Sequence, residues 1–153
     1  MAYRKRKIIL FFSLVALVSA ALVVSFLSFQ PQTEPTIREV KIGGQILKAE
    51  IASRPYSQYL GLSGRENLAV NSAMLFLFSD ARQRYFVMRG MEFPLDIIFL
   101  NNHKILNISF ATPPAGDGPE ILYASAGPAD AVLEVNAGFA KEVNLGVGDY
   151  VSY

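Results

Sequence analysis

The 153-residue chain contains no cysteine and no tryptophan, and it has a single histidine, His103. Without cysteine the fold can use neither disulfide bonds nor thiol chemistry, and it cannot carry a lipid-modified cysteine. One histidine without cysteine also argues against a transition-metal site. We therefore predict a domain that folds on its hydrophobic core alone, with no metal and no cofactor.

Charge is also scarce, since charged residues make up 18% of the chain and hydrophobic residues 52%. Four of the 14 basic residues precede position 8 and none of the 13 acidic residues does, so residues 8–153 have ten basic and 13 acidic side chains and a formal charge of −3. A mildly acidic domain offers no electrostatic basis for binding nucleic acid, which we exclude as a partner.

Residues 8–29 carry no charge at all over 22 positions. A helix rises about 1.5 Å per residue, so this segment reaches about 33 Å and can cross a bilayer. Residues 1–7 form a basic leader, and basic residues tend to stay in the cytoplasm. The pattern predicts a single-pass anchor in the cell membrane, with the C-terminal domain extracytoplasmic, either periplasmic or at the cell surface.

A cleaved signal sequence is the alternative interpretation of residues 8–29. Val18, Ser19 and Ala20 fit a small-residue cleavage site, but cleavage there would leave the apolar residues 21–29 on the mature chain. We therefore favour the uncleaved anchor. Residues 30–36, with two prolines, are predicted to be a short extended linker to a domain at 37–153.

The pattern of residues 37–153 is mainly that of short strands. Residues 37–52 form two strands around Gly43 and Gly44, a favoured hairpin turn. Pro55 predicts the start of one short helix, and residues 137–145 favour another helical turn or two. Further strands are predicted at 73–78, 93–100, 104–111, 131–136 and 149–153. The sequence therefore predicts a mainly β domain, a compact β-sandwich with one or two short helices.

Five segments in order resemble the domain of unknown function 192 family over about residues 37–153. They are GLSGR at 61–65, AMLFLF at 73–78, FPLDIIFL at 93–100, VLEVNAG at 132–138 and GVGDYV at 146–151. The resemblance implies a compact β-rich fold of jelly-roll-like topology and no established reaction. Where that family has Phe-Trp-Met-Lys-Asn, this chain lacks the second aromatic and the amide, with Phe86, Val87, Met88, Arg89 and Gly90 in their places.

Three carboxylates fall inside apolar strands, namely Glu50, Asp96 and Glu134. Because side chains alternate along a strand, each lies on the face opposite its apolar neighbours. A buried charge persists only when it is paired or hydrogen-bonded, and Arg65 and Arg89 are the natural partners. Asp96 follows Pro94, so we favour it as a structural anchor that accepts backbone N–H groups at the strand entry.

A polar cleft is the second interpretation of these side chains. It would join Glu50, Arg65, Asp96 and Glu134 and could do acid–base work if the carboxyl pKa values were driven apart. The overall prediction is a membrane-anchored extracytoplasmic binding or interaction module, favoured over an enzyme and held in the membrane by residues 8–29. Its expected ligand is an envelope protein or a carbohydrate. The alternatives are an envelope hydrolase that uses Glu50, Asp96 and Glu134, and a purely structural role.

Overall fold

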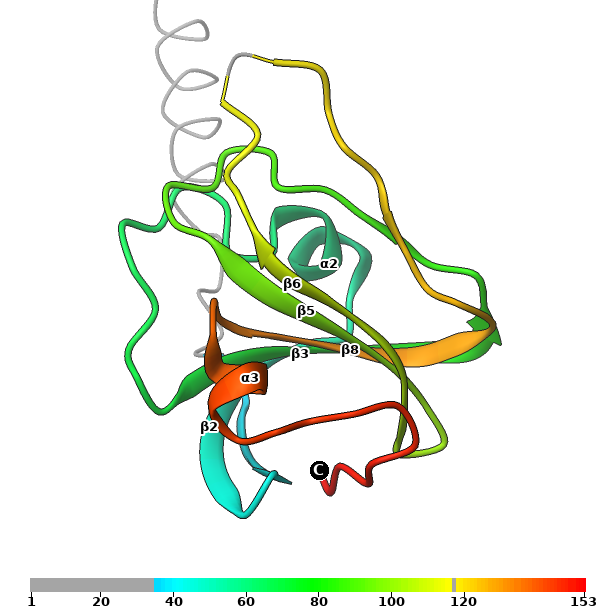
Figure 1. The fold of residues 1–153 in the computed structure, drawn as a ribbon. Helices are drawn as coiled ribbons and strands as arrows, with labels where there is room; N and C mark the ends of the chain where they lie inside the picture. Colours follow the sequence, from blue (N-terminus) through cyan, green and yellow to red (C-terminus); the bar gives the residue numbers. More distant parts are fainter. Residues whose placement is uncertain (1–34, 117) are drawn as a thin grey trace, which may run out of the picture. The chain divides into compact units, whose positions relative to one another are not determined.

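A computed structural model describes residues 35–116 and 118–153, whose regular secondary structure is mainly β-strand (Figure 1). The predicted leader at 1–7 and anchor at 8–29, with most of the linker at 30–36, lie outside the described residues. Among the residues described, no helix is long and apolar enough to span a bilayer. The prediction of a mainly β domain with one or two short helices is confirmed, and the described residues contain two.

Six strands form one mixed sheet in the order β1-β2-β3-β8-β5-β6. Their bounds are β1 Ile37–Ile42, β2 Gln45–Ala52, β3 Ser72–Arg82, β5 Leu95–Asn101, β6 Lys104–Thr112 and β8 Ala129–Asn136. Neighbours run antiparallel except β2 and β3, which are parallel and are joined by a crossover that contains helix α2 (Pro55–Leu60). Two short strands, β4 (Tyr85–Phe86) and β7 (Tyr123–Ala124), make a second, two-stranded sheet. The strands of the described residues thus form one sheet of six and one sheet of two.

The hairpin predicted at Gly43 and Gly44 is present, a second hairpin joins β5 to β6, and left-handed backbone explains each. Gly43 and Gly44 have φ values of 56° and 76°, and Asn102 and His103 have φ values of 46° and 63°. Two consecutive residues with positive φ form the turn whose twist matches the flanking strands, and glycine and asparagine adopt that backbone at low cost. These turns fix the registers of β1 with β2 and of β5 with β6.

The sheet separates two hydrophobic clusters. One face carries Leu75, Ile98, Leu133 and their neighbours, and the other carries Phe76, Ile97 and theirs. Helix α2 lies on one side of β3 and β8, and helix α3 (Phe139–Glu142) lies on the opposite side (Figure 1). Since strand residues alternate between faces, a carboxylate's position in its strand decides which cluster it joins.

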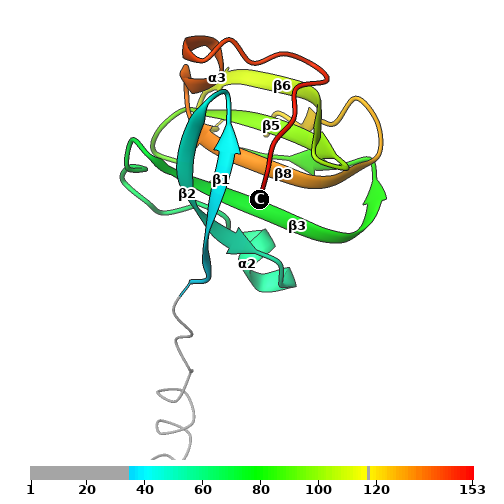
Figure 2. The same cartoon turned by 90° about the horizontal axis from the view of Figure 1, so that it is seen from below.

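The C-terminal segment covers the face that carries Leu75. Ser152 bridges to Lys41 of β1 and Tyr150 bridges to Lys104 of β6, so the segment links the two edge strands of the sheet (Figure 2). Val151 between them is fully buried. Covering both edges in this way protects backbone groups that would otherwise be open to pairing with another chain. The opposite face stays partly open, and it holds the candidate site.

Candidate functional site

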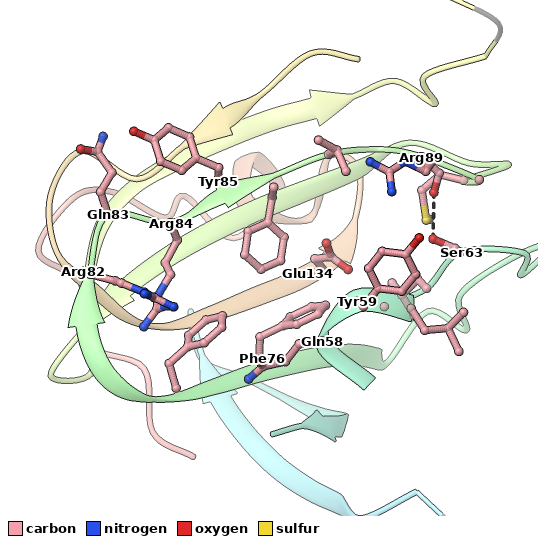
Figure 3. Close-up of a pocket in the computed structure, with 18 residues that line it drawn as sticks. Gln58, Tyr59, Ser63, Phe76, Arg82, Gln83, Arg84, Tyr85, Arg89 and Glu134 are labelled. Atoms are coloured by element: carbon pink, nitrogen blue, oxygen red, sulfur yellow. Dashed lines mark hydrogen bonds between the residues drawn. The ribbon is translucent and has the colours of Figure 1, made fainter. Parts of the chain in front are cut away.

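A pocket of about 750 Å³ lies on the sheet face that carries Phe76. Its lining combines α2 and the following turn, β3, the segment 82–91 and one residue of β8. Figure 3 shows Glu134 in the centre, with Arg84 toward one end and Tyr59 and Arg89 toward the other. Most of the remaining lining is apolar or aromatic, as is usual for small-molecule sites.

Helix α2 is positioned by its sequence and by contacts to the sheet. Pro55 begins the helix, where its missing N–H has no helical partner to lose. Gly61 ends it with a φ of 53°, and a side chain there would lie only 3.4 Å from the Phe76 ring. Gln58 Nε2 donates to the carbonyl of Leu77 at 2.7 Å, which ties the helix to β3. The helix therefore holds Tyr59 at the edge of the pocket.

Glu134 is the carboxyl at the floor of the pocket. Its register partners in the adjacent strands are Met74 and Ile97, and the residue is only 5% exposed. Within residues 35–116 and 118–153, its carboxyl has neither a hydrogen bond nor an ion pair. Burial raises the pKa of Glu134 to about 8. At neutral pH the carboxyl is therefore mostly protonated, and it can donate one hydrogen bond and accept others.

The aromatic wall beside Glu134 is well ordered by edge-to-face packing. The Phe86 ring meets Phe76 with centroids 4.9 Å apart and Phe99 with centroids 5.9 Å apart, both at nearly right angles. Such contacts add to the burial of the rings and fix their orientation. Phe76 and Phe86 line the pocket, so its apolar wall is preformed.

Three arginines border the pocket, and each contacts a carboxylate. Arg84 is buried, donates to Asp80 Oδ1 at 2.6 Å and stacks 3.8 Å from the centre of the Phe78 ring. Arg82 makes a longer 3.5 Å contact to the other oxygen of Asp80. Arg89 pairs through two nitrogens with Glu120. The pKa of Asp80 and that of Glu120 are lowered chiefly by hydrogen bonds from Arg84 and Arg89 respectively.

The main chain at Arg89 is held firmly. Ser63 donates its hydroxyl to the carbonyl of Arg89 at 2.8 Å (Figure 3). Gly64 donates its N–H to the carbonyl of Gly90 at 2.7 Å. Gly90 has a φ of 63°, and an added Cβ would lie 3.3 Å from Ser63 Cβ. The turn that contains the GLSGR segment therefore positions Arg89.

Glu50 and Arg65, two of the predicted site residues, pair with each other. Arg65 donates from both terminal nitrogens to the two oxygens of Glu50, at 2.5 and 2.7 Å. This hydrogen-bonded pair lowers the pKa of Glu50 and raises that of Arg65. Glu50 is in register with Met74, which is in register with Glu134, so the two glutamates lie on one face roughly 10 Å apart at Cα. Neither Glu50 nor Arg65 lines the pocket.

Asp96 lies on the other face of the sheet, in register with Val135. It is 0% exposed, and its two oxygens accept backbone N–H groups from Ala111 at 2.7 Å and from Gly138 and Ala140 at 3.0 Å each. The predicted anchoring of Asp96 by backbone N–H groups is confirmed. The predicted arginine partner is wrong, because Arg65 pairs with Glu50 and Arg89 with Glu120.

The structure therefore divides the four predicted cleft residues among three places. Glu134 lies in the pocket, Glu50 and Arg65 form an ion pair on the same face outside it, and Asp96 is sealed on the opposite face. Sequence reasoning missed the role of Phe86 to Gly90 as a pocket wall. Four of the five residues of this segment line the pocket, namely Phe86, Val87, Arg89 and Gly90. The departure of the segment from the family pattern was the one feature of the sequence that could have indicated a site there.

The model of the DUF192 family, described as an uncharacterized ACR, matches residues 38–153. The chain belongs to the DUF192 family. The resemblance read from the sequence is thereby confirmed, and no curated protein matches the chain.

Two crystal structures resemble this member of the DUF192 family closely. One is a protein of unknown function from Novosphingobium aromaticivorans, 31% identical, with a TM-score of 0.73 over 81% of this chain and 90% of the other. The second, from Sinorhizobium meliloti, is described as a candidate transcription regulator. It is 27% identical, with a TM-score of 0.71 over 79% of this chain and 96% of the other.

Proposed function

We propose that this DUF192 chain is a membrane-anchored, extracytoplasmic binding module whose pocket takes a small molecule with an apolar ring. The charge-free residues 8–29 and the basic leader support the anchor and the orientation. The unpaired Glu134 carboxyl at the pocket floor supports the binding site, and it is the observation on which the proposal rests. We also propose that the domain has the jelly-roll-like topology that the family resemblance implies.

The Glu134 carboxyl has no hydrogen bond within the described fold and opens onto the pocket, so it is available to bind something else. Perturbed carboxyls in clefts are candidate site residues. Glu134 meets this description, because burial alone raises its pKa and it lies in a pocket of about 750 Å³. A bound molecule would supply the missing hydrogen bond. The same volume is within the range for drug-sized ligands.

The chemistry at the floor favours a neutral polar group on the ligand. A protonated carboxyl forms hydrogen bonds with a hydroxyl, carbonyl or amide without creating a buried charge. An ammonium group would have to ionise Glu134 and lose its own hydration, and such buried ion pairs often fail to repay desolvation. The rings of Phe76 and Phe86 would pack against an apolar ligand body. A hydroxylated ring, whether aromatic or a sugar, satisfies both requirements.

The test is calorimetric titration of the purified full chain with neutral probes: 4-hydroxybenzamide, 4-hydroxyphenylacetamide and methyl glucoside. We expect at least one to bind, and Glu134→Leu to weaken its binding about tenfold or more, because a lost buried hydrogen bond is worth about 1–3 kcal/mol. Glu50→Gln is the matched control, since it removes a carboxylate from the same face outside the pocket. Failure of every probe to bind, or binding unchanged in Glu134→Leu, would contradict the proposal.

An envelope hydrolase is the second candidate, and one observation favours it. The pKa of Glu50 is lowered while that of Glu134 is raised, which is how one enzyme separates a base from an acid. Against it, Glu50 is fully engaged by Arg65 outside the pocket, and Asp96 lies on the opposite face. Turnover of nitrophenyl glycosides that both Glu50→Gln and Glu134→Gln abolish would favour the hydrolase over the binding module.

A further inference from the structure

We infer that the ligand of this pocket is a small organic anion. Its carboxylate or phosphate group replaces Glu120 as the ion-pair partner of the Arg89 guanidinium. The inference rests on the proposed function, because it names the chemical class that the binding module takes. It assigns the two ends of the ligand to different groups. The neutral polar end meets Glu134 at the floor, and the charged end meets Arg89 at the border of the pocket.

Arg89 presents a preorganised anion site. Its backbone is fixed on both sides by the Ser63 hydroxyl and by the hydrogen bond between Gly64 and Gly90. Its side chain remains 56% exposed at the pocket border, near Tyr59 (Figure 3). A guanidinium on a rigid main chain loses less freedom when it binds, and that favours bidentate recognition of a carboxylate or phosphate.

Glu120 already occupies the edge of the guanidinium that an anionic ligand would use. Both of its oxygens contact Arg89, one at Nε and the other at Nη2, at 2.9 Å for the latter pair. Glu120 is itself 39% exposed and does not line the pocket. An exposed ion pair of this kind contributes little and is screened by salt. A ligand anion that is also held by the pocket can therefore displace it.

The other two arginines are less suited to this role. Arg84 is buried and its donors are used by Asp80 and by the carbonyl of Ala129. Arg82 makes only a long contact to Asp80 and is the most exposed of the three. The three guanidinium groups share two carboxylate partners, so this border carries an excess of positive charge. That excess favours the approach of an anion.

The experiment compares matched acids and amides of increasing length, titrated into the full chain at low salt. The pairs are 4-hydroxybenzoate with its amide, 4-hydroxyphenylacetate with its amide, and 3-(4-hydroxyphenyl)propionate with its amide. For the pair of best length, we expect the acid to bind about tenfold more tightly, as a charge-assisted bidentate contact predicts. Arg89→Gln should remove this preference, because it should weaken acid binding about tenfold more than amide binding.

Glu120→Gln should strengthen acid binding about three- to tenfold, because it removes the internal competitor, and should not affect the amide. Arg38→Gln and Glu39→Gln are the matched controls, since they make the same charge changes on exposed β1 positions outside the pocket. Both controls should leave the acid-to-amide ratio as in the wild type.

The outcomes separate this inference from the proposed function. If amides bind as tightly as acids and Arg89→Gln changes neither, the anion assignment is overturned while the pocket remains a binding site. If Glu120→Gln leaves acid affinity unchanged, or changes it no more than Glu39→Gln does, competition by Glu120 is overturned. If no acid and no amide binds, both proposals fall together.

Discussion

Asp96 and Glu134 are both buried carboxylates in neighbouring strands, and their surroundings are opposite. Asp96 accepts three backbone N–H groups from parts of the chain up to 44 residues away. Glu134 has no hydrogen-bond partner among the described residues, and only burial affects its pKa. The two lie on opposite faces, so one sheet holds a satisfied carboxyl on its closed side and an unsatisfied one on its open side.

This contrast distinguishes a structural carboxylate from a functional one without reference to a reaction. A satisfied buried carboxylate joins elements, and its removal leaves several donors without an acceptor. A carboxyl that makes no hydrogen bond within the fold and opens onto a pocket joins no elements and is available for another purpose. The predictions below test whether the two residues differ in this way, from the largest expected effect to the smallest.

Asp96→Ala should give the largest change, a loss of about 2–4 kcal/mol in the free energy of unfolding. The substitution leaves the N–H groups of Ala111, Gly138 and Ala140 buried without an acceptor. Asp96→Asn should cost less, because the amide oxygen still accepts at one position. Urea unfolding of the full chain measures both, and an Asp96→Ala variant as stable as the wild type would mean that Asp96 is not a structural anchor.

Glu134 should make the protein less stable as pH rises. Its pKa is about 8 in the folded chain and near 4.5 when unfolded, so the folded state binds the proton more tightly. The resulting stabilisation is complete below pH 4.5 and is lost as pH rises through 8. Between pH 6 and pH 8 we expect a loss of about 2 kcal/mol.

Glu134→Gln should flatten this part of the stability profile, because glutamine does not titrate. The informative quantity is the difference between the wild type and the variant, since other groups contribute equally to both. Identical slopes in urea unfolding at pH 6, 7 and 8 would show that the Glu134 carboxyl is not protonated in the folded state.

The sequence predicts more about Asp96 than about Glu134, and the reason is physical. A carboxylate just after Pro94 in a strand has few uses other than accepting backbone N–H groups, so its anchoring role follows from local chemistry. Its donors Gly138 and Ala140 are far away in sequence and come from tertiary packing. The alternation of side chains shows which residues of one strand lie on the same face as its carboxylate. Only the register between strands shows which carboxylates of different strands lie on the same face of the sheet.

The pocket depended on features that no local pattern specifies. The parallel pairing of β2 with β3 sends α2 across the sheet, and this places Tyr59 near the segment 85–90. The hairpins and α2 were predictable because glycine, asparagine and proline fix local backbone angles. The carboxylate partners of Arg65 and Arg89 could not be predicted, since a long arginine side chain can reach several carboxylates.

Glu134→Leu should stabilise the protein by about 1 kcal/mol at pH 8, where the wild-type carboxyl is substantially ionised. Leucine would lie beside Met74 and Ile97, which are apolar neighbours. Asp96→Leu is the opposing control and should destabilise, because it leaves three N–H groups without an acceptor. Thermal unfolding at pH 8 measures the stability of both variants. If both are less stable than the wild type, the proposed difference between a structural Asp96 and a functional Glu134 is wrong.

The smallest effect concerns Glu50, which is on the face of Glu134 but has a charged partner. A double-mutant cycle of Glu50→Gln and Arg65→Gln should give a coupling energy of about 0.2–1 kcal/mol that falls with added salt. Because Arg65 lowers the pKa of Glu50, this stabilisation is present above pH 4.5 and is lost as pH falls through the folded pKa, opposite to the trend for Glu134. Glu50→Gln should therefore leave the slope between pH 6 and pH 8 unchanged. A changed slope would mean that Glu50 and Glu134 titrate together, and the hydrolase would then be the better assignment.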